Sequence, residues 1–247
     1  GNYWKWEHPN YNRVYIVVAD VARGDGSDFS TFQVIDIEDS SQVAEYRGKI
    51  ETKDFGNFLV AVATEWNNAL LIIENSNVGW ATIQQVIDRA YGNLFYMSND
   101  LKYIDVEKQV SNKFYRDEKK LVAGFGTTIK TRPLIISTLD TYINSKDILI
   151  RSQRLIDELF TFIWYNGRAE AMKGYNDDLT MALAIGLWVR NTALRLKQEG
   201  IDLTKTMLNS TQVSQYTGFV ASGHLKKNPY EMEVGKGDIE NLTWLLR

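Results

Sequence analysis

The sequence predicts an α/β domain built on a mixed β-sheet flanked by helices, and three patterns indicate this class. Residues 14–20 (VYIVVAD) and 69–74 (ALLIIE) stay apolar up to a final carboxylate, as expected of central strands covered on both faces. Residues 29–37 and 42–50 read as two more strands around an acidic turn, which gives an antiparallel meander. Segments with helical apolar spacing follow and alternate with short strands.

The first helix is expected at residues 52–66, where Phe55, Leu59 and Val62 lie near one face. A right-handed crossover through this helix would lay residues 69–74 parallel to residues 14–20. A second helix is expected at residues 80–92, with Gly92 as its stop. A further strand is expected directly after it, at residues 93–97.

The second half of the chain begins with a break in the pattern at residues 100–132. This segment holds eight Lys or Arg against five Asp or Glu, and it predicts a hairpin or a mobile loop. The elements expected after Pro133 are a helix to residue 145, a short strand at 148–152, a helix or helix–strand unit at 153–164 and a long helix within 174–200. The polar tail beyond Gly200 is expected to dock or to be poorly ordered.

Composition narrows the function classes. The 247 residues, 44% of them hydrophobic, can bury one sizeable core. With no cysteine and only two histidines, His8 and His224, the chain offers no thiolate zinc site and disfavours Ser-His-Asp chemistry. No apolar run reaches the length of a membrane span, so no membrane partner is expected. The net charge of −3 argues against a histone-like basic binder but is compatible with a local basic patch.

Acidic residues stand where buried apolar segments meet turns, at Asp20, at Glu74 and at the pair Asp177–Asp178. Neighbouring parallel strands end at the same edge of a sheet, so we expect Asp20 and Glu74 to face each other there. Two carboxylates about 4 Å apart repel by roughly 4 kcal/mol at an effective dielectric near 20. Such a cluster should take up protons or bind Mg²⁺ or Mn²⁺, which prefer hard oxygen ligands.

Each acid also has an ordinary structural explanation. Asp20 precedes a glycine-rich turn and fits an Asx turn. Asp177 and Asp178 precede an apolar helix and fit an N-cap. Glu74 is harder to explain in this way, because glutamate is uncommon at strand ends and in turns. The combination of acids at one expected edge therefore favours a metal site, with Asp28 near enough to support it.

Four motifs, VVADVARGDGSDFSTFQVIDI, LLIIENSNVGW, GFGTTIKTRPLII and GYNDDLTMALAIGLW, occur in this order within roughly residues 11–196. Together they resemble the nuclease domain of the large terminase subunit of tailed bacteriophages, most closely the contractile-tailed branch. The resemblance implies a ribonuclease H-like fold and a metal-dependent endonuclease that cuts concatemeric viral DNA during genome packaging, in the host cytoplasm. It also implies double-stranded DNA, the portal protein and the small terminase subunit as partners.

The resemblance places the family's catalytic acids on Asp20, Glu74 and Asp178, with Asp177 as the alternative to Asp178 and Asp28 as an accessory acid. Two Mg²⁺ or Mn²⁺ ions are expected, with Asp20 bridging both, and such an ion pair can activate water and stabilise the leaving oxygen. The family's full-length protein also carries an N-terminal ATPase motor. Because this chain starts without Met and lacks a P-loop pattern, it is expected to be a fragment without that motor. Residues 1–247 are then a single nuclease domain, with a core at about 11–199 and an extension at 200–247.

Basic residues of the 100–132 segment are candidates for sequence-independent phosphate contacts, namely Lys113, Arg116, Lys119, Lys120, Lys130 and Arg132. Two other functions remain open on the sequence. One is a different ribonuclease H-like enzyme, such as a junction resolvase or a transposase. The other is a non-catalytic module that docks to the packaging motor and uses the acids only as caps.

Overall fold

The computed structural model describes residues 2–23, 28–76, 78–98, 121–165 and 167–194, and the backbone of two short strands near the C-terminus. The chain divides into two compact units, Gly1–Leu196 and Lys197–Arg247. In the second unit, β10 (Glu231–Glu233) and β11 (Ile239–Asn241) pair antiparallel. No helix among the described residues is long and apolar enough to cross a membrane.

A five-stranded sheet organises the first unit, and its strand order is β1-β4-β3-β2-β5. The strands are β1 (Tyr3–Lys5), β2 (Tyr15–Asp20), β3 (Ser30–Asp36), β4 (Gln42–Gly48) and β5 (Leu70–Ile73). All neighbouring pairs are antiparallel except β2 and β5, which are parallel. The predicted meander and parallel crossover are therefore confirmed. The edge strand β1 was not predicted, because its three residues carry no apolar alternation.

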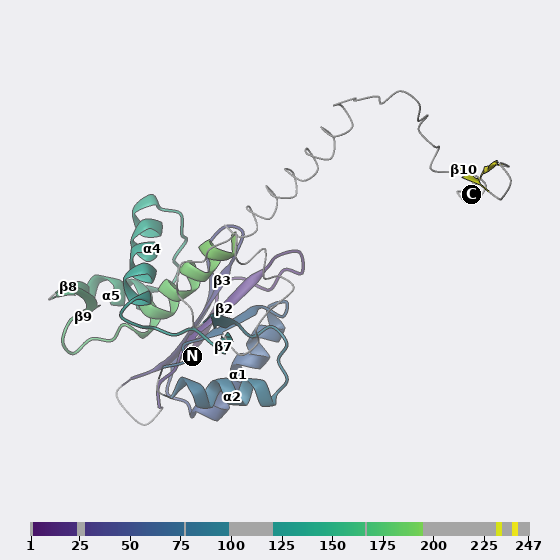
Figure 1. The fold of residues 1–247 in the computed structure, drawn as a ribbon. Coiled ribbons are helices and arrows are strands. Elements are labelled where there is room, and N and C mark those ends of the chain that lie inside the picture. The colour runs from purple at the N-terminus through teal and green to yellow at the C-terminus, as the bar shows by residue number, and fades with distance from the viewer. Residues whose placement is uncertain are drawn as a thin grey trace. The chain divides into compact units, whose positions relative to one another are not determined.

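Helices cover both faces of this sheet (Figure 1). On one face α1 (Thr52–Glu65) and α2 (Gly79–Asp88) pack against Tyr15, Val17 and Ala19 of β2. On the other face Ile16 and Val18 meet α4 (Thr131–Ser145), α5 (Gln153–Thr161) and the helix over residues 178–194. Because successive side chains of a strand point to opposite faces, Asp20 lies on the same face as Ile16 and Val18.

The helix boundaries differ from prediction in two places. The stop of α2 was placed wrongly at Gly92, because the helix ends at Asp88 and Ala90 takes the left-handed conformation, with φ of 54°. Helix α4 begins at Thr131 and includes Pro133 in its first turn, where a missing N–H costs nothing.

Two strand predictions are also corrected. Only part of residues 93–97 forms a strand, β6 (Tyr96–Ser98), which pairs with β7 (Leu121–Ala123). Residues 148–152 form no strand, because Leu149 makes only an isolated bridge to Ser41.

The segment after α5 confirms the predicted helix–strand unit and extends it. Strand β8 (Phe162–Tyr165) pairs with β9 (Arg168–Ala171) in a hairpin, with Gly167 at a φ of +76° in its turn. A short turn then leads to the helix over residues 178–194, so the hairpin feeds the chain directly into the Asp177–Asp178 pair.

Candidate functional site

Asp20 and Glu74 meet at the carboxyl edge of the parallel pair β2–β5. Ala19 lies opposite Ile73, and the Glu74 amide donates to the Ala19 carbonyl at 2.9 Å. The two side chains follow directly in register, and the charge of Glu74 helps to raise the pKa of Asp20. The expectation that the two acids face each other is therefore confirmed.

The backbone around Glu74 is held by hydrogen bonds on the side away from β2. The Asn75 amide donates to the Phe125 carbonyl at 2.9 Å, and the Phe125 amide donates to Ile73 at 2.8 Å. A Cβ on Gly79 would lie 1.9 Å from the Glu74 carbonyl oxygen, so no other residue fits there without movement. The Ser76 hydroxyl donates to Glu74 Oε1 at 3.2 Å, which orients the carboxylate.

Asp178, the first residue of the helix over residues 178–194, is the third acid of the cluster. Its Oδ2 accepts from the Phe29 amide at 3.3 Å and from Asn176 Nδ2 at 3.2 Å. Its carbonyl oxygen accepts from the Thr31 hydroxyl at 3.2 Å, and Thr31 is the strand partner of Asp20. These contacts bring Asp178 beside the end of β2 although it lies far away in the sequence.

The cluster has a high affinity for positive charge. Burial, followed by the charges of Glu74 and Asp178 and the hydrogen bond to Glu74, raises the pKa of Asp20 well above its ordinary value. Burial also raises the pKa of Asp178, against the opposing hydrogen bonds from Asn176 and Phe29 and with further contributions from the charges of Asp177 and then Asp28. The accessory acid Asp28 is thus near enough to act on Asp178.

The helix that carries Asp178 is capped by a residue that the sequence did not reveal, Glu158 of α5. Glu158 Oε2 accepts from the amides of Leu179 at 2.9 Å and Thr180 at 3.1 Å. The Asp177 carbonyl accepts the first helical hydrogen bond, from Met181, so Asp177 occupies the N-cap position. The predicted N-cap position of Asp177 is therefore confirmed, but the side chain that accepts from the Leu179 and Thr180 amides is that of Glu158.

A sequence signal for Glu158 did exist. Helix α5 is strongly amphipathic, and Glu158 lies three residues after the buried Leu155, on the same face. A carboxylate on the apolar face of a helix indicates a buried polar partner, since an unpaired one would be costly.

Asp177 is paired with a cation, Arg132. Its Oδ2 accepts from Arg132 Nη2 at 3.0 Å, and the Arg132 Nε and Nη2 atoms also donate to the Ala169 carbonyl at 3.3 and 3.0 Å. This ion pair compensates part of the charge of Asp177, whereas the Asp178 carboxylate accepts from the Phe29 amide and from Asn176. The ion pair also occupies Arg132, one of the residues predicted to contact DNA.

Of the other residues predicted to contact DNA, the structure describes one. Lys130 is exposed next to the start of α4. The remaining candidates, Lys113, Arg116, Lys119 and Lys120, lie outside the described residues.

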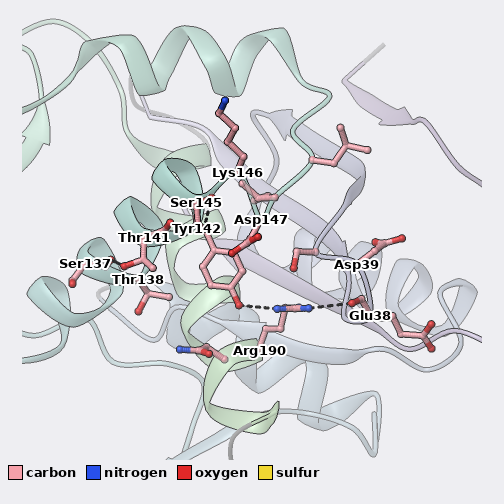
Figure 2. Close-up of a pocket in the computed structure, with 14 residues that line it drawn as sticks. Glu38, Asp39, Ser137, Thr138, Thr141, Tyr142, Ser145, Lys146, Asp147 and Arg190 are labelled. Atoms are coloured by element: carbon pink, nitrogen blue, oxygen red, sulfur yellow. Dashed lines mark hydrogen bonds between the residues drawn. The ribbon is translucent and has the colours of Figure 1, made fainter.

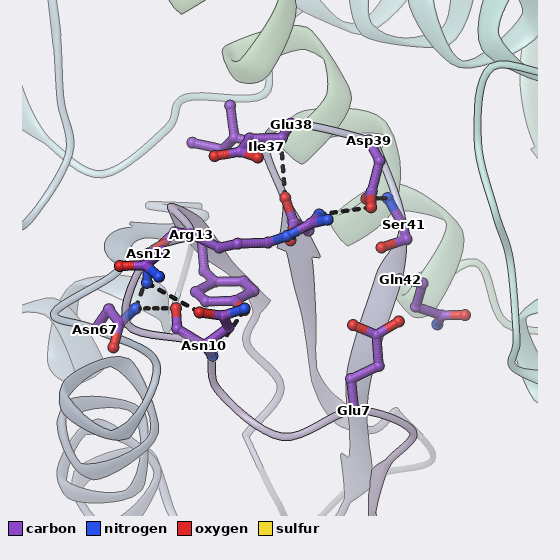
Figure 3. Close-up of polar contacts among 12 residues, drawn as sticks. Glu7, Asn10, Asn12, Arg13, Ile37, Glu38, Asp39, Ser41, Gln42 and Asn67 are labelled. Carbon is purple, nitrogen blue, oxygen red and sulfur yellow. Dashed lines mark hydrogen bonds and ion pairs between the residues drawn. The ribbon is translucent and has the colours of Figure 1, made fainter.

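The opposite end of strands β2 and β3, away from Asp20, carries a second group of polar residues. A polar cavity of about 740 Å³ lies there, between the β3–β4 turn and the C-terminal end of α4 (Figure 2). Its most buried cation, Arg190, donates to the Tyr142 hydroxyl at 2.7 Å and to the Ile37 carbonyl at 2.6 Å. Arg13 closes the same turn by pairing with Asp36 at 2.9 Å and Asp39 at 2.6 Å (Figure 3). Arg13 is thus paired with two carboxylates, and Arg190 with a hydroxyl and backbone carbonyls.

The acid cluster offers carboxylate oxygens, the ligand type that hard divalent cations prefer. Within the described ranges, no three carboxylate or imidazole groups stand at the mutual spacing that a bound ion requires. The Asp20 carboxyl is buried next to the charges of Glu74 and Asp178, which together raise its pKa well above its ordinary value. Carboxylate oxygens are the ligands that Mg²⁺ and Mn²⁺ prefer, so these side chains suit such an ion in their chemistry although their spacing is not that of a bound one.

An antiparallel meander, a parallel crossover and helices on both faces define a ribonuclease H-like fold, with the acids at one edge of its sheet. Searches of solved structures found the same fold in the large terminase nuclease of thermophilic phage G20c. The structures with bound cobalt and with bound magnesium each give a TM-score of 0.58 at 17% identity, covering 76% of this chain and 87% of that one. The large terminase nuclease domain of Thermus phage P74-26 gives 0.51 at 17% identity, covering 75% and 84%. No family model matches the chain.

Proposed function

We propose that this chain is a metal-dependent DNA endonuclease of the large terminase type, acting in phage genome packaging. The observation that carries the proposal is the strand register that ends β2 on Asp20 and β5 before Glu74, with Asp178 held beside them through Thr31. The solved terminase nucleases with the same fold, some with bound metal ions, add support.

In this proposal Asp20, Glu74 and Asp178 hold two Mg²⁺ or Mn²⁺ ions, with Asp28 as an accessory acid. When bound, the ions activate water and stabilise the leaving oxygen of phosphodiester hydrolysis. The protein's own part is to keep the three acids in place. Ser76 orients Glu74, and the Phe29 amide and Asn176 orient Asp178. Arg132 keeps the neighbouring Asp177 paired, which limits the negative charge at the site.

The finer parts of the proposal concern the substrate and its setting. We propose concatemeric double-stranded viral DNA as the substrate, and the portal protein and small terminase subunit as partners, in the host cytoplasm during assembly. The phage would belong to the contractile-tailed branch. The alternative is another ribonuclease H-like nuclease, such as a junction resolvase or a transposase, and the preferred DNA substrate separates the two.

A plasmid-cleavage assay tests the proposal. We expect the 247-residue chain to nick and linearise plasmid DNA with Mg²⁺ or Mn²⁺ and to be inactive in EDTA. Asp20→Asn should lower the rate at least about 100-fold, and Asp140→Asn, an exposed acid on α4, should leave it unchanged. Equal cleavage by Asp20→Asn and wild type would refute the proposed site. Cleavage of four-way junctions in strong preference to plasmid would favour a resolvase.

A further inference from the structure

Strand pairing places a cation, Arg47, near the acid cluster. Asp20 of β2 lies opposite Thr31 of β3, and Thr31 lies opposite Arg47 of β4. Directly opposed residues share a face of the sheet. Two strand spacings place the Cα atoms of Asp20 and Arg47 about 10 Å apart. Arg47 therefore lies on the same face and at the same edge as the proposed metal ligands.

The charge of Arg47 is only partly compensated within the fold. Its Nη1 lies 3.8 Å from Glu158 Oε1, too far for a hydrogen bond. Its Nε is buried and has no hydrogen-bond partner among the described residues, and the same holds for Glu158 Oε1. The other oxygen of Glu158 is used by the helix amides. Because the Arg47 side chain is still 24% exposed and its ion pair to Glu158 is long, an external anion can reach this cation.

A second cation approaches the same place. The guanidinium of Arg47 lies over the Phe29 ring at 4.4 Å from its centroid, and the ammonium of Lys49 lies 5.7 Å from that centroid. Both cations lie against this one ring, so an anion that approaches the ring is attracted by two positive charges. The Phe29 amide donates to Asp178, which puts this pair of cations directly beside the acid cluster.

We infer that Arg47 and Lys49 bind a backbone phosphate of the DNA strand that is cut at the acid cluster. This inference rests on the proposed nuclease function and deepens it. The three carboxylates repel the phosphates of approaching DNA. Two cations beside them reduce this repulsion for a phosphate next to the scissile one. Arg132, predicted from the sequence for such a role, is instead occupied by Asp177 and Ala169.

The test measures DNA affinity against salt concentration in an Asp20→Asn background, so that the duplex stays intact. Each phosphate contact contributes about 0.9 to the negative log–log salt slope. We expect Lys49→Met and Arg47→Met each to flatten the slope by about 0.9 and to weaken binding roughly 10-fold. Lys146→Met, which removes a lysine at the opposite edge of the sheet, is the matched control and should change neither.

Kinetic constants and thermal shifts of these variants distinguish a phosphate contact from a structural role. In the active protein, Lys49→Met should raise KM and leave kcat and the Mn²⁺-induced thermal shift unchanged. Lys49 is exposed, so this variant decides the matter even if Arg47→Met does not fold. A wild-type salt slope and KM in Lys49→Met would overturn the inference.

The two proposals fail in different ways. If the wild type cuts plasmid DNA but Lys49→Met binds with an unchanged slope, only the phosphate contact is wrong. If the wild type cuts no DNA while the slope depends on Arg47 and Lys49, the contact stands and the nuclease assignment is wrong.

Discussion

Replacing Glu158 by glutamine tests whether a carboxylate from α5 caps the helix that carries Asp178. The Glu158 side chain is 6% exposed and accepts from two amides of that helix. Glutamine keeps an acceptor oxygen in the same place and removes the charge. Alanine removes both, and it leaves two buried N–H groups without partners.

The magnitude follows from the pKa of Glu158. Burial, opposed by the Thr180 amide and by the charge of Arg47, raises this pKa from 4.5 to about 7. Between these two values the folded protein binds more protons at Glu158 than the unfolded chain does. The contribution of Glu158 to folding is therefore fully present below pH 4.5 and is lost as the pH rises through 7. The loss is on the order of 3 kcal/mol.

Glutamine does not titrate. The free energy of unfolding of Glu158→Gln should therefore be close to that of the wild type near pH 5 and should exceed it increasingly as the pH rises. At pH 8 we expect its free energy of unfolding to exceed that of the wild type by about 2 kcal/mol. Glu158→Ala should cost about 2–4 kcal/mol near pH 5, from the two unsatisfied amides.

Urea unfolding of the three proteins from pH 5 to pH 8 measures both effects. The other acids with raised pKa, Asp20 and Asp178, are present in each protein, so their contributions largely cancel in the differences. A difference between Glu158→Gln and wild type that stays flat or reverses with pH would show that Glu158 is charged and well paired. A cost below 1 kcal/mol for Glu158→Ala would show that it is not the cap.

Three further predictions concern the acid cluster. Asp20→Asn should leave the melting temperature in EDTA unchanged or raise it, because it removes a charge that burial and two acids disfavour; a large drop would make Asp20 structural. Saturating Mn²⁺, at 100 times its Kd, should stabilise the wild type by about 2.7 kcal/mol. The shift should shrink in Asp178→Ala and persist in Asp177→Ala, and the reverse order in thermal melts would assign the ligand to Asp177. Gly79→Ala should cost about 1–3 kcal/mol, since its Cβ would overlap a backbone oxygen at 1.9 Å, whereas Gly92→Ala, with open space, should be nearly neutral in the same melts.

Local rules were enough to predict the central part of the fold from the sequence. The apolar runs at residues 14–20 and 69–74 and the helix between them determine a parallel pair, because strand-to-strand crossovers are right-handed. From that pairing alone, Asp20 and Glu74 had to end at one edge of the sheet, and the structure places them in contact there. The short edge strand β1 escaped prediction because three residues carry too little pattern.

Tertiary structure alone decided how the charges are paired. Asp177 and Asp178 are neighbours with the same local signal, and only the packing of α4 and the β8–β9 hairpin puts Arg132 against Asp177. Asp178 is held by Phe29, 149 residues away in the sequence, and Glu158 reaches its helix only because α5 packs beside it. Such pairings depend on distances between elements that no periodicity encodes. The sequence could therefore place acids at the carboxyl ends of the strands, but only the fold determined which of them is paired with Arg132.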